Sequence, residues 1–241
     1  MRHRAPGVFQ LYGADACTVD GAILSSVVPP LTTIFTDAIA RLTGIPPMVV
    51  GPGIRTGLNI KAEIHNQLGS DIVASSVAAI AKYPSPIVMV DMGTATSLSL
   101  IVGSVYEGCI IMPGLALALD ALSERAAALP PISIETASPV GLMGHTTEEA
   151  MRSGVLYGHA SMVDGMLERI EESIGQSVTT VATGGNAPRI LRYCKRPIQY
   201  DADLIMTGLY LLYQEKRQNG NREMPVTGHA FLYSTAVCVG K

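Results

Sequence analysis

A carboxylate and several hydroxyls lie together at the end of one apolar segment of the chain. The segment ends at Asp91, and Gly93, Thr94, Thr96 and Ser97 follow it closely. A carboxylate oxygen beside backbone N–H groups and hydroxyl donors suits the phosphates of a nucleotide and their counter-ions. The alternative is a plain hairpin, in which Asp and Gly suit the turn and Thr suits the strands. The short motif alone leaves both interpretations open.

The segments around this turn favour the phosphate site. The pattern predicts a strand on each side of the turn, a second turn at Gly103-Ser104, a third strand over 105–112 and, after Pro113-Gly114, a helical run over 115–129. Three hairpin-linked strands followed by a helix are the opening of a ribonuclease-H-like half-domain, as found in acetate and sugar kinases, Hsp70 and actin. We therefore interpret the Asp91 turn as a candidate phosphate site.

A pair of glycines, Gly184 and Gly185, stands between a predicted strand over 178–182 and a short predicted helix over 188–193. Paired glycines at such a junction let the backbone approach an anionic ligand, and the start of the helix adds N–H donors. A plain connecting turn explains the same residues. Together with the Asp91 turn, the pair favours nucleotide binding.

Two further groups stand at expected helix starts. Asp71, after Gly69 and Ser70, opens a helix predicted over 70–82, where Asp is a common capping residue. Its functional interpretation is a carboxylate that accepts a hydroxyl proton as the substrate attacks a phosphoryl group. Thr146 and Thr147, before two glutamates, form a capping-box pattern that opens a helix over 147–174 and explains these residues structurally.

Composition excludes several classes of protein. The 241 residues include 48% hydrophobic and 15% charged residues, and the formal net charge is −3. Lys and Arg are scattered, so we expect no nucleic-acid partner. The four cysteines are widely spaced, which favours a reducing, cytoplasmic compartment. Because no stretch approaches the ~20 apolar residues of a membrane span, we expect neither an anchor nor a signal peptide.

Strands and helices alternate along the chain, which predicts an α/β fold with mixed sheets. Further strands are expected over 22–28 and 48–50, and further helices over 31–42 and 203–215. Two prolines in Tyr83-Pro84-Ser85-Pro86 mark the clearest internal boundary. We therefore expect two ribonuclease-H-like (actin-like ATPase) half-domains over 1–85 and 86–215, followed by a tail over 216–241.

From about Gly21 to Glu215 the chain resembles the type III pantothenate kinases, bacterial enzymes that phosphorylate pantothenate with ATP as the first step toward coenzyme A. Many motifs carry the resemblance in one order: Ser25-Ser26-Val27-Val28-Pro29, Arg55-Thr56-Gly57-Leu58, Asp91-Met92-Gly93-Thr94-Ala95-Thr96, Tyr106-Glu107-Gly108, Pro113-Gly114, Leu129-Pro130, Thr147 to Gly154, Tyr157-Gly158, Ala182-Thr183-Gly184-Gly185 and Gly208-Leu209.

The resemblance implies a role for each candidate residue. Asp71 would be the general base, and Asp91 would bind a monovalent cation, K⁺ or NH₄⁺. The ATP phosphates, with Mg²⁺, would meet Thr94 and its neighbours Gly93 and Thr96, and the glycine pair Gly184-Gly185. The pantothenate site would include Gly69, Ser70, Ile72, Thr146 and Thr147. The family works as a homodimer, with this pocket at the subunit interface.

The chain departs from the family at two places. The family opens with a strand and an Asp-x-Gly-Asn-Thr phosphate loop, which residues 1–21 do not contain. We therefore expect a first half-domain truncated at its N-terminus, and a natural gene that encodes the missing hairpin upstream. The family also has Arg after the base, where this chain has Ile72, which offers no hydrogen bond. The alternatives are a non-catalytic paralogue that binds a nucleotide or a pantothenate-like ligand with a regulatory role, or another transferase or hydrolase of the same superfold.

Overall fold

The computed structural model describes residues 19, 21–51, 54, 56–61, 68–135 and 140–220, with side chains up to 217. Its chain divides into two compact units. The first comprises Met1–Ala81 with Leu204–Lys241, and the second comprises Lys82–Asp203. Within the described residues, no helix is long and apolar enough to cross a membrane.

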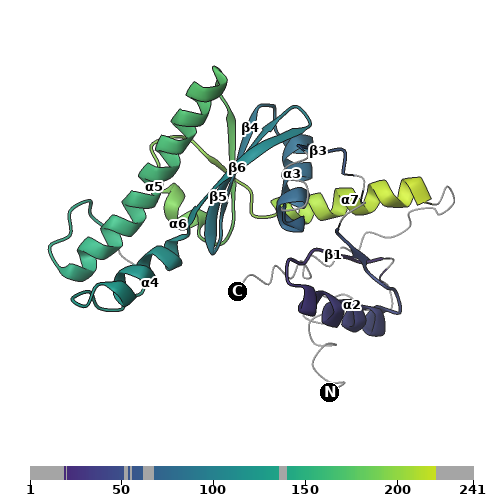
Figure 1. The fold of residues 1–241 in the computed structure, drawn as a ribbon, viewed down its shortest axis with the longest axis horizontal. Coiled ribbons are helices and arrows are strands. Elements are labelled where there is room, and N and C mark those ends of the chain that lie inside the picture. Colours follow the sequence, from purple (N-terminus) through teal and green to yellow (C-terminus); the bar gives the residue numbers. More distant parts are fainter. Residues whose placement is uncertain are drawn as a thin grey trace. The chain divides into compact units, whose positions relative to one another are not determined.

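The described part of the first unit contains β1 (Ile23–Leu24), α2 (Pro29–Thr43), β2 (Met48–Val49), β3 (Asn59–Ile60), α3 (Ser70–Lys82, whose last residue lies beyond the unit boundary) and α7 (Leu204–Gly220) (Figure 1). β1 and β2 pair in parallel. α7 packs on α3 so closely that a Cβ at Gly208 would lie 1.8 Å from the carbonyl oxygen of Ala74. Val50, Leu209 and Leu212 complete this small core.

The second unit is built on a mixed sheet. Its strands are β4 (Ile87–Met92), β5 (Ala95–Val102), β6 (Val105–Pro113), β7 (Thr179–Thr183) and β8 (Gln199–Tyr200), in the spatial order β6-β5-β4-β7-β8. The first three strands along the chain pair antiparallel, whereas β7 joins β4 in parallel and β8 joins β7 in parallel. This order is the ribonuclease-H-like arrangement, and it confirms the predicted α/β fold with a mixed sheet.

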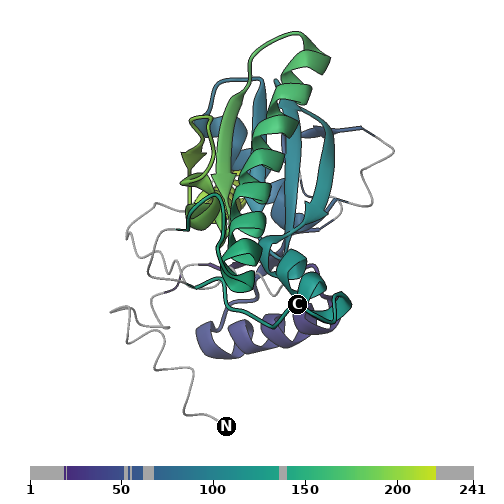
Figure 2. The same ribbon diagram turned by 90° about the vertical axis from the view of Figure 1, so that its left-hand side faces the viewer.

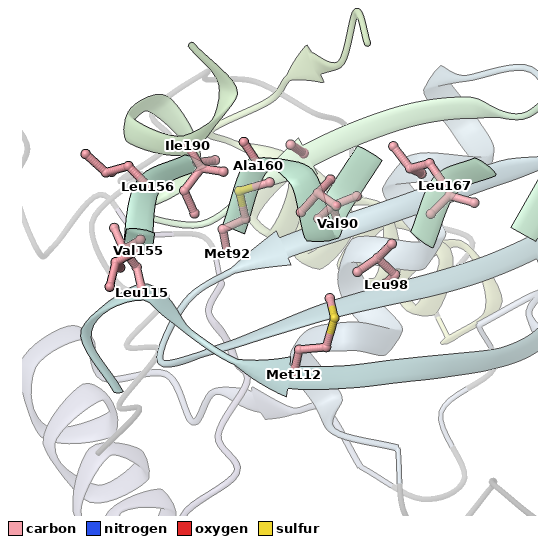
Figure 3. Close-up of a cluster of buried hydrophobic side chains, with 14 of the residues drawn as sticks. Val90, Met92, Leu98, Met112, Leu115, Val155, Leu156, Ala160, Leu167 and Ile190 are labelled. Carbon is pink, nitrogen blue, oxygen red and sulfur yellow. The ribbon is translucent and has the colours of Figure 1, made fainter. Parts of the chain in front are cut away.

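Helices α4 (Leu115–Arg125), α5 (Thr147–Ile174) and α6 (Ala187–Leu191) lie on one face of this sheet (Figure 1), and α5 runs along the strands (Figure 2). Strand residues alternate between faces, so Val90, Met92 and Leu98 point toward the helices. There they pack against fully buried Leu167 and Ile190 (Figure 3). Burial of this face fixes the register of β4 and β5, and with it the position of the turn that follows Asp91.

The structure differs from the expected elements in a few places. The strand expected over 22–28 pairs only at Ile23–Leu24, because the chain then turns into α2, whose first residues Pro29 and Pro30 suit the first turn of a helix. The compact units also differ from the expected domains. The observed border follows Ala81 rather than residue 85, and α7 belongs to the first unit because its apolar side packs against α3.

Candidate functional site

The β4–β5 turn places Asp91 between two neighbouring strands. Asp91 is opposite Ser97 of β5 and opposite Thr183 of β7. The turn itself is tight, since the N–H of Gly93 donates to the carbonyl oxygen of Ala95 at 3.0 Å. Asp91 is half-buried, whereas Thr94 in the turn is exposed. The end of β4 therefore presents a carboxylate and a hydroxyl at the edge where β7 also ends.

Gly184 brings the second glycine turn directly against this carboxylate. Its φ is +93°, in the left-handed region, and a Cβ on it would lie 2.7 Å from Asp91 Oδ1 and 2.7 Å from the carbonyl oxygen of Met92. Glycine is the residue that adopts this φ without strain and fits this space. The predicted phosphate turn and the predicted glycine pair are thus one structure, built from segments far apart in the sequence.

Two more backbone segments hold the β4–β5 turn. The N–H of Gly114, just before α4, donates to the carbonyl oxygen of Thr94 at 3.1 Å. A Cβ on Gly114 would lie 2.2 Å from that oxygen, so this position also has no room for a side chain. From the other side, the N–H of Asn186 donates to Met92 O at 3.0 Å, and its side-chain Nδ2 donates to Gly93 O at 3.2 Å.

Thr96 lies differently from the other residues proposed for this site. It pairs with Met92 across the hairpin and is fully buried, on the same strand face as Leu98. Its hydroxyl has no hydrogen-bond partner among the described residues. Strand alternation turns Thr96 toward the helices and away from the side of Asp91 and Ser97, so it is not placed to contact a ligand at the turn.

Asp71 is in the first turn of α3. Its Oδ1 accepts a hydrogen bond of 2.8 Å from the N–H of Ile72, which is one of the donors that a helix start leaves unpaired. Ser70 Oγ is 2.8 Å from Ser25 Oγ, and Ser25 is almost completely buried. A Cβ on Gly69 would lie 2.3 Å from Asp71 Oδ1. The Ser25-Ser26 segment and the Gly69–Asp71 segment thus form one local structure in the first unit.

Thr146 forms the capping box that the sequence predicts. Its Oγ1 accepts from the N–H of Glu149 at 3.2 Å, while Glu149 Oε2 accepts from the N–H of Thr146 at 3.2 Å. Thr146 and Thr147 are both exposed. The helix thus begins at Thr147, as predicted, and the structural role accounts for the residue types.

Among the described residues no three His, Cys, Asp or Glu side chains cluster to hold a metal ion. The residues that could hold a cation at the turn are Asp91, with its carboxylate oxygens, and the neighbouring backbone carbonyls.

Comparison with known proteins decides the family. Residues 6–169 match the family of type III pantothenate kinases. The chain is 40% identical over 201 residues to a type III pantothenate kinase of an Exiguobacterium species, covering 83% of this chain and 78% of that protein. It is 41% identical over 197 residues to a type III pantothenate kinase of Bacillus cytotoxicus, covering 81% and 74%.

The chain belongs to the type III pantothenate kinase family. This confirms the resemblance seen in the motifs, although the family match begins at residue 6, ahead of Gly21. A crystal structure from Campylobacter jejuni, described as a Baf family transcriptional activator, shares the fold, with a TM-score of 0.56 and 20% identity over 84% of this chain and 87% of that one. Membership in the family makes the chain a kinase, a transferase that uses ATP.

In this type III pantothenate kinase chain, local sequence patterns predict most of the residues at the β4–β5 turn but not the residues that hold the turn in place. The structure brings together four of the predicted residues, Asp91, Gly93, Thr94 and Gly184. Gly185 lies beside them, and a Cβ there would meet no atom within 4 Å. Asn186 was missed because its contact with Gly93 spans 93 positions. The side-chain amide directly after the glycine pair was the available signal.

Proposed function

We propose that this chain transfers the γ-phosphoryl group of ATP to the primary hydroxyl of pantothenate, giving 4′-phosphopantothenate, the first step of coenzyme A biosynthesis. The observation that carries the proposal is the junction of Asp91 with the Gly184 turn, in a chain that belongs to the type III pantothenate kinase family. Such a transfer relies on positioning and on charge neutralisation more than on covalent chemistry by the protein.

In the proposal, Asp71 is the general base. Its carboxylate is partly exposed at the start of α3, and the hydrogen bond from Ile72 N–H occupies only Oδ1. That bond fixes the side chain, and Oδ2 is the oxygen assigned to the hydroxyl proton of pantothenate. We propose that Asp71 and its neighbours Gly69, Ser70 and Ile72 contact pantothenate, and that Thr146 and Thr147 also take part in its binding.

The proposal assigns the ATP phosphates to the backbone N–H groups and the hydroxyl of the β4–β5 turn and to the Gly184-Gly185 turn. At Gly185 a Cβ would meet no atom within 4 Å, so a phosphate has room to approach the backbone there. Thr94 is exposed at the turn and supplies a hydroxyl donor. Because Thr96 is fully buried on the opposite strand face, we assign it to the packing beneath the turn.

The Asp91 carboxylate fits a monovalent cation, K⁺ or NH₄⁺, held with backbone carbonyl oxygens, and Mg²⁺ would arrive with the ATP phosphates. These cations would neutralise phosphate charge when bound. We also propose that the protein acts as a homodimer, as the family resemblance implies, and in the cytoplasm, as the widely spaced cysteines indicate.

The test is ADP formation by the purified chain with ATP and Mg²⁺, in the presence and absence of pantothenate and of K⁺, with the phosphorylated product identified by mass spectrometry. Strict dependence on pantothenate supports the proposal. ADP formation at the same rate with and without pantothenate would indicate another transferase or hydrolase. Nucleotide binding without turnover would indicate the non-catalytic paralogue, which the Ile72 side chain favours because it cannot donate a hydrogen bond to the acceptor.

A further inference from the structure

Asn186 stands at the N-terminal cap position of α6, yet its side chain does not cap that helix. An Asn at this position normally uses its side-chain oxygen to accept from a backbone N–H of the first turn. Here Nδ2 instead donates to the carbonyl oxygen of Gly93 at 3.2 Å, and Oδ1 accepts from Arg189 Nη1 at 3.3 Å. The amide therefore connects the β4–β5 turn to the Arg189 side chain of α6, and it bonds to no backbone N–H of that helix.

The orientation of this amide follows from its neighbours. Gly93 offers a carbonyl oxygen, which only accepts, and Arg189 offers a guanidinium, which only donates. The amide nitrogen must then face Gly93 and the amide oxygen must face Arg189. Arg189 is held in turn by Glu135, with Nη2 3.0 Å from Oε1. Glu135, Arg189 and Asn186 thus form a chain of contacts that ends on the β4–β5 turn.

We propose that Asn186 is a positioning residue that fixes the β4–β5 turn in its phosphate-binding form, and that Arg189, held by Glu135, orients its amide. The inference rests on the proposed function in assigning the phosphates of ATP to that turn. Asn186 makes two hydrogen bonds to this region, since its backbone N–H also donates to Met92 O at 3.0 Å. Substitution leaves that backbone bond in place and removes the side-chain bond alone.

The ion pair itself contributes little to folding. Arg189 is 39% exposed and Glu135 is 77% exposed, and solvent screens pairs of this kind. Variants of Arg189 are therefore expected to fold normally. We expect these variants to loosen the β4–β5 turn instead, because without Arg189 the Asn186 amide is no longer oriented toward Gly93 O.

Asn186→Ala should raise KM for ATP about five- to tenfold, because one hydrogen bond that prearranges the turn is lost. KM for pantothenate should stay unchanged. Arg189→Gln should raise KM for ATP by a smaller factor, and should add nothing in the Asn186→Ala background, since both act through the same amide. Arg192→Gln is the matched control, because Arg192 follows the same helix at its C-terminal cap and, among the described residues, its Nε donates only to Pro188 O.

Hydrogen exchange of the turn without any ligand gives a readout that does not need activity. Faster exchange at residues 93–96 in Asn186→Ala and Arg189→Gln, and not in Arg192→Gln, is the expected result. If the parent chain lacks pantothenate-dependent turnover but shows this exchange pattern, the proposed function fails and the positioning role stands. Unchanged exchange in both variants, or effects on KM that add independently, would overturn the positioning role.

Discussion

Gly184 lies against Asp91 with no room for a side chain between them, since a Cβ at Gly184 would be 2.7 Å from Asp91 Oδ1. The contact joins the ends of β4 and β7, which run parallel and end at the same edge of the sheet. A fold that brings a carboxylate this close to the backbone of a neighbouring turn needs the smallest residue at that point.

Gly184→Ala should therefore disable the turn. The added Cβ clashes with Asp91 and with Met92 O, and alanine is strained at φ +93°. We expect loss of nucleotide binding and a lower melting temperature. Gly185→Ala is the matched control for folding, because a Cβ there meets no atom within 4 Å. Equal melting temperatures of the two variants in calorimetry would contradict the close contact at Gly184.

Asp71→Asn should lower kcat by at least about a hundredfold while leaving the fold intact. The amide oxygen of Asn accepts the same hydrogen bond from Ile72 N–H, but an amide does not take up the hydroxyl proton at neutral pH. Steady-state turnover measured beside a thermal melt checks this. A variant that keeps its turnover and melts like the parent chain would remove Asp71 as the base.

Asp91→Asn should abolish stimulation of turnover by K⁺, because the carboxylate supplies the formal negative charge at the end of β4. The substitution keeps the size of the side chain, so the close packing with Gly184 is preserved. Turnover is measured in K⁺ and in tetramethylammonium salts at equal ionic strength. Stimulation by K⁺ that persists in the variant would place the cation site elsewhere.

Local patterns predicted the bounds of two helices, whereas the helix expected over 115–129 ends at Arg125. Helix α5 has the bounds 147–174 that the sequence indicates, because the Thr146 capping box marks its start and Gly175, at φ +68°, marks its end. Helix α3 has the predicted bounds 70–82 for a related reason, since apolar periodicity ends just before the prolines at 84 and 86.

Contacts between distant segments could not be predicted in this way. The pairing of α7 with α3 depends on the fit of Gly208 against Ala74, which no local pattern encodes. Thr96 matched the motif by type, but the strand register turned it into the core. Asn186 matched a helix cap, and only the fold showed that its amide bonds to Gly93 instead.

Leu167→Ala should lower the free energy of unfolding by about 2–5 kcal/mol, because this fully buried side chain fills the space between α5 and the sheet. Leu117→Ala, at a half-exposed position of α4, should change it by less than about 0.5 kcal/mol. Urea denaturation of both variants compares the two. Similar losses would mean that the core of the second unit does not lie where α5 packs.

The last prediction concerns Asp201, which lies beside Lys82 and accepts a hydrogen bond of 2.9 Å from Tyr83 Oη. Burial alone would raise the pKa of Asp201, but the bonds from Lys82 and Tyr83 outweigh it and hold the pKa below 3.8. Burial and the same carboxylate raise the pKa of Tyr83 from 10.0 to about 12.

The two shifts act in opposite pH ranges. A lowered carboxyl pKa stabilises the fold above pH 3.8, and this stabilisation is lost as the pH falls through the folded-state pKa. A raised phenol pKa stabilises the fold below pH 10, and this stabilisation is lost as the pH rises through about 12. Tyr83→Phe should therefore reduce the fall in unfolding free energy between pH 10 and 12. It should leave most of the fall at low pH unchanged, because Lys82 still bonds to Asp201.

Asp201→Asn should remove the contribution of Asp201 to the loss of stability in acid. It should reduce the loss between pH 10 and 12 only in part, because burial, the larger cause of the raised Tyr83 pKa, remains. Urea denaturation across the pH range, compared with the parent chain at each pH, isolates these groups from others such as Cys194, whose pKa burial also raises to about 12. Parallel curves for the parent chain and Asp201→Asn at both extremes would show that the Lys82–Asp201–Tyr83 cluster does not form in solution.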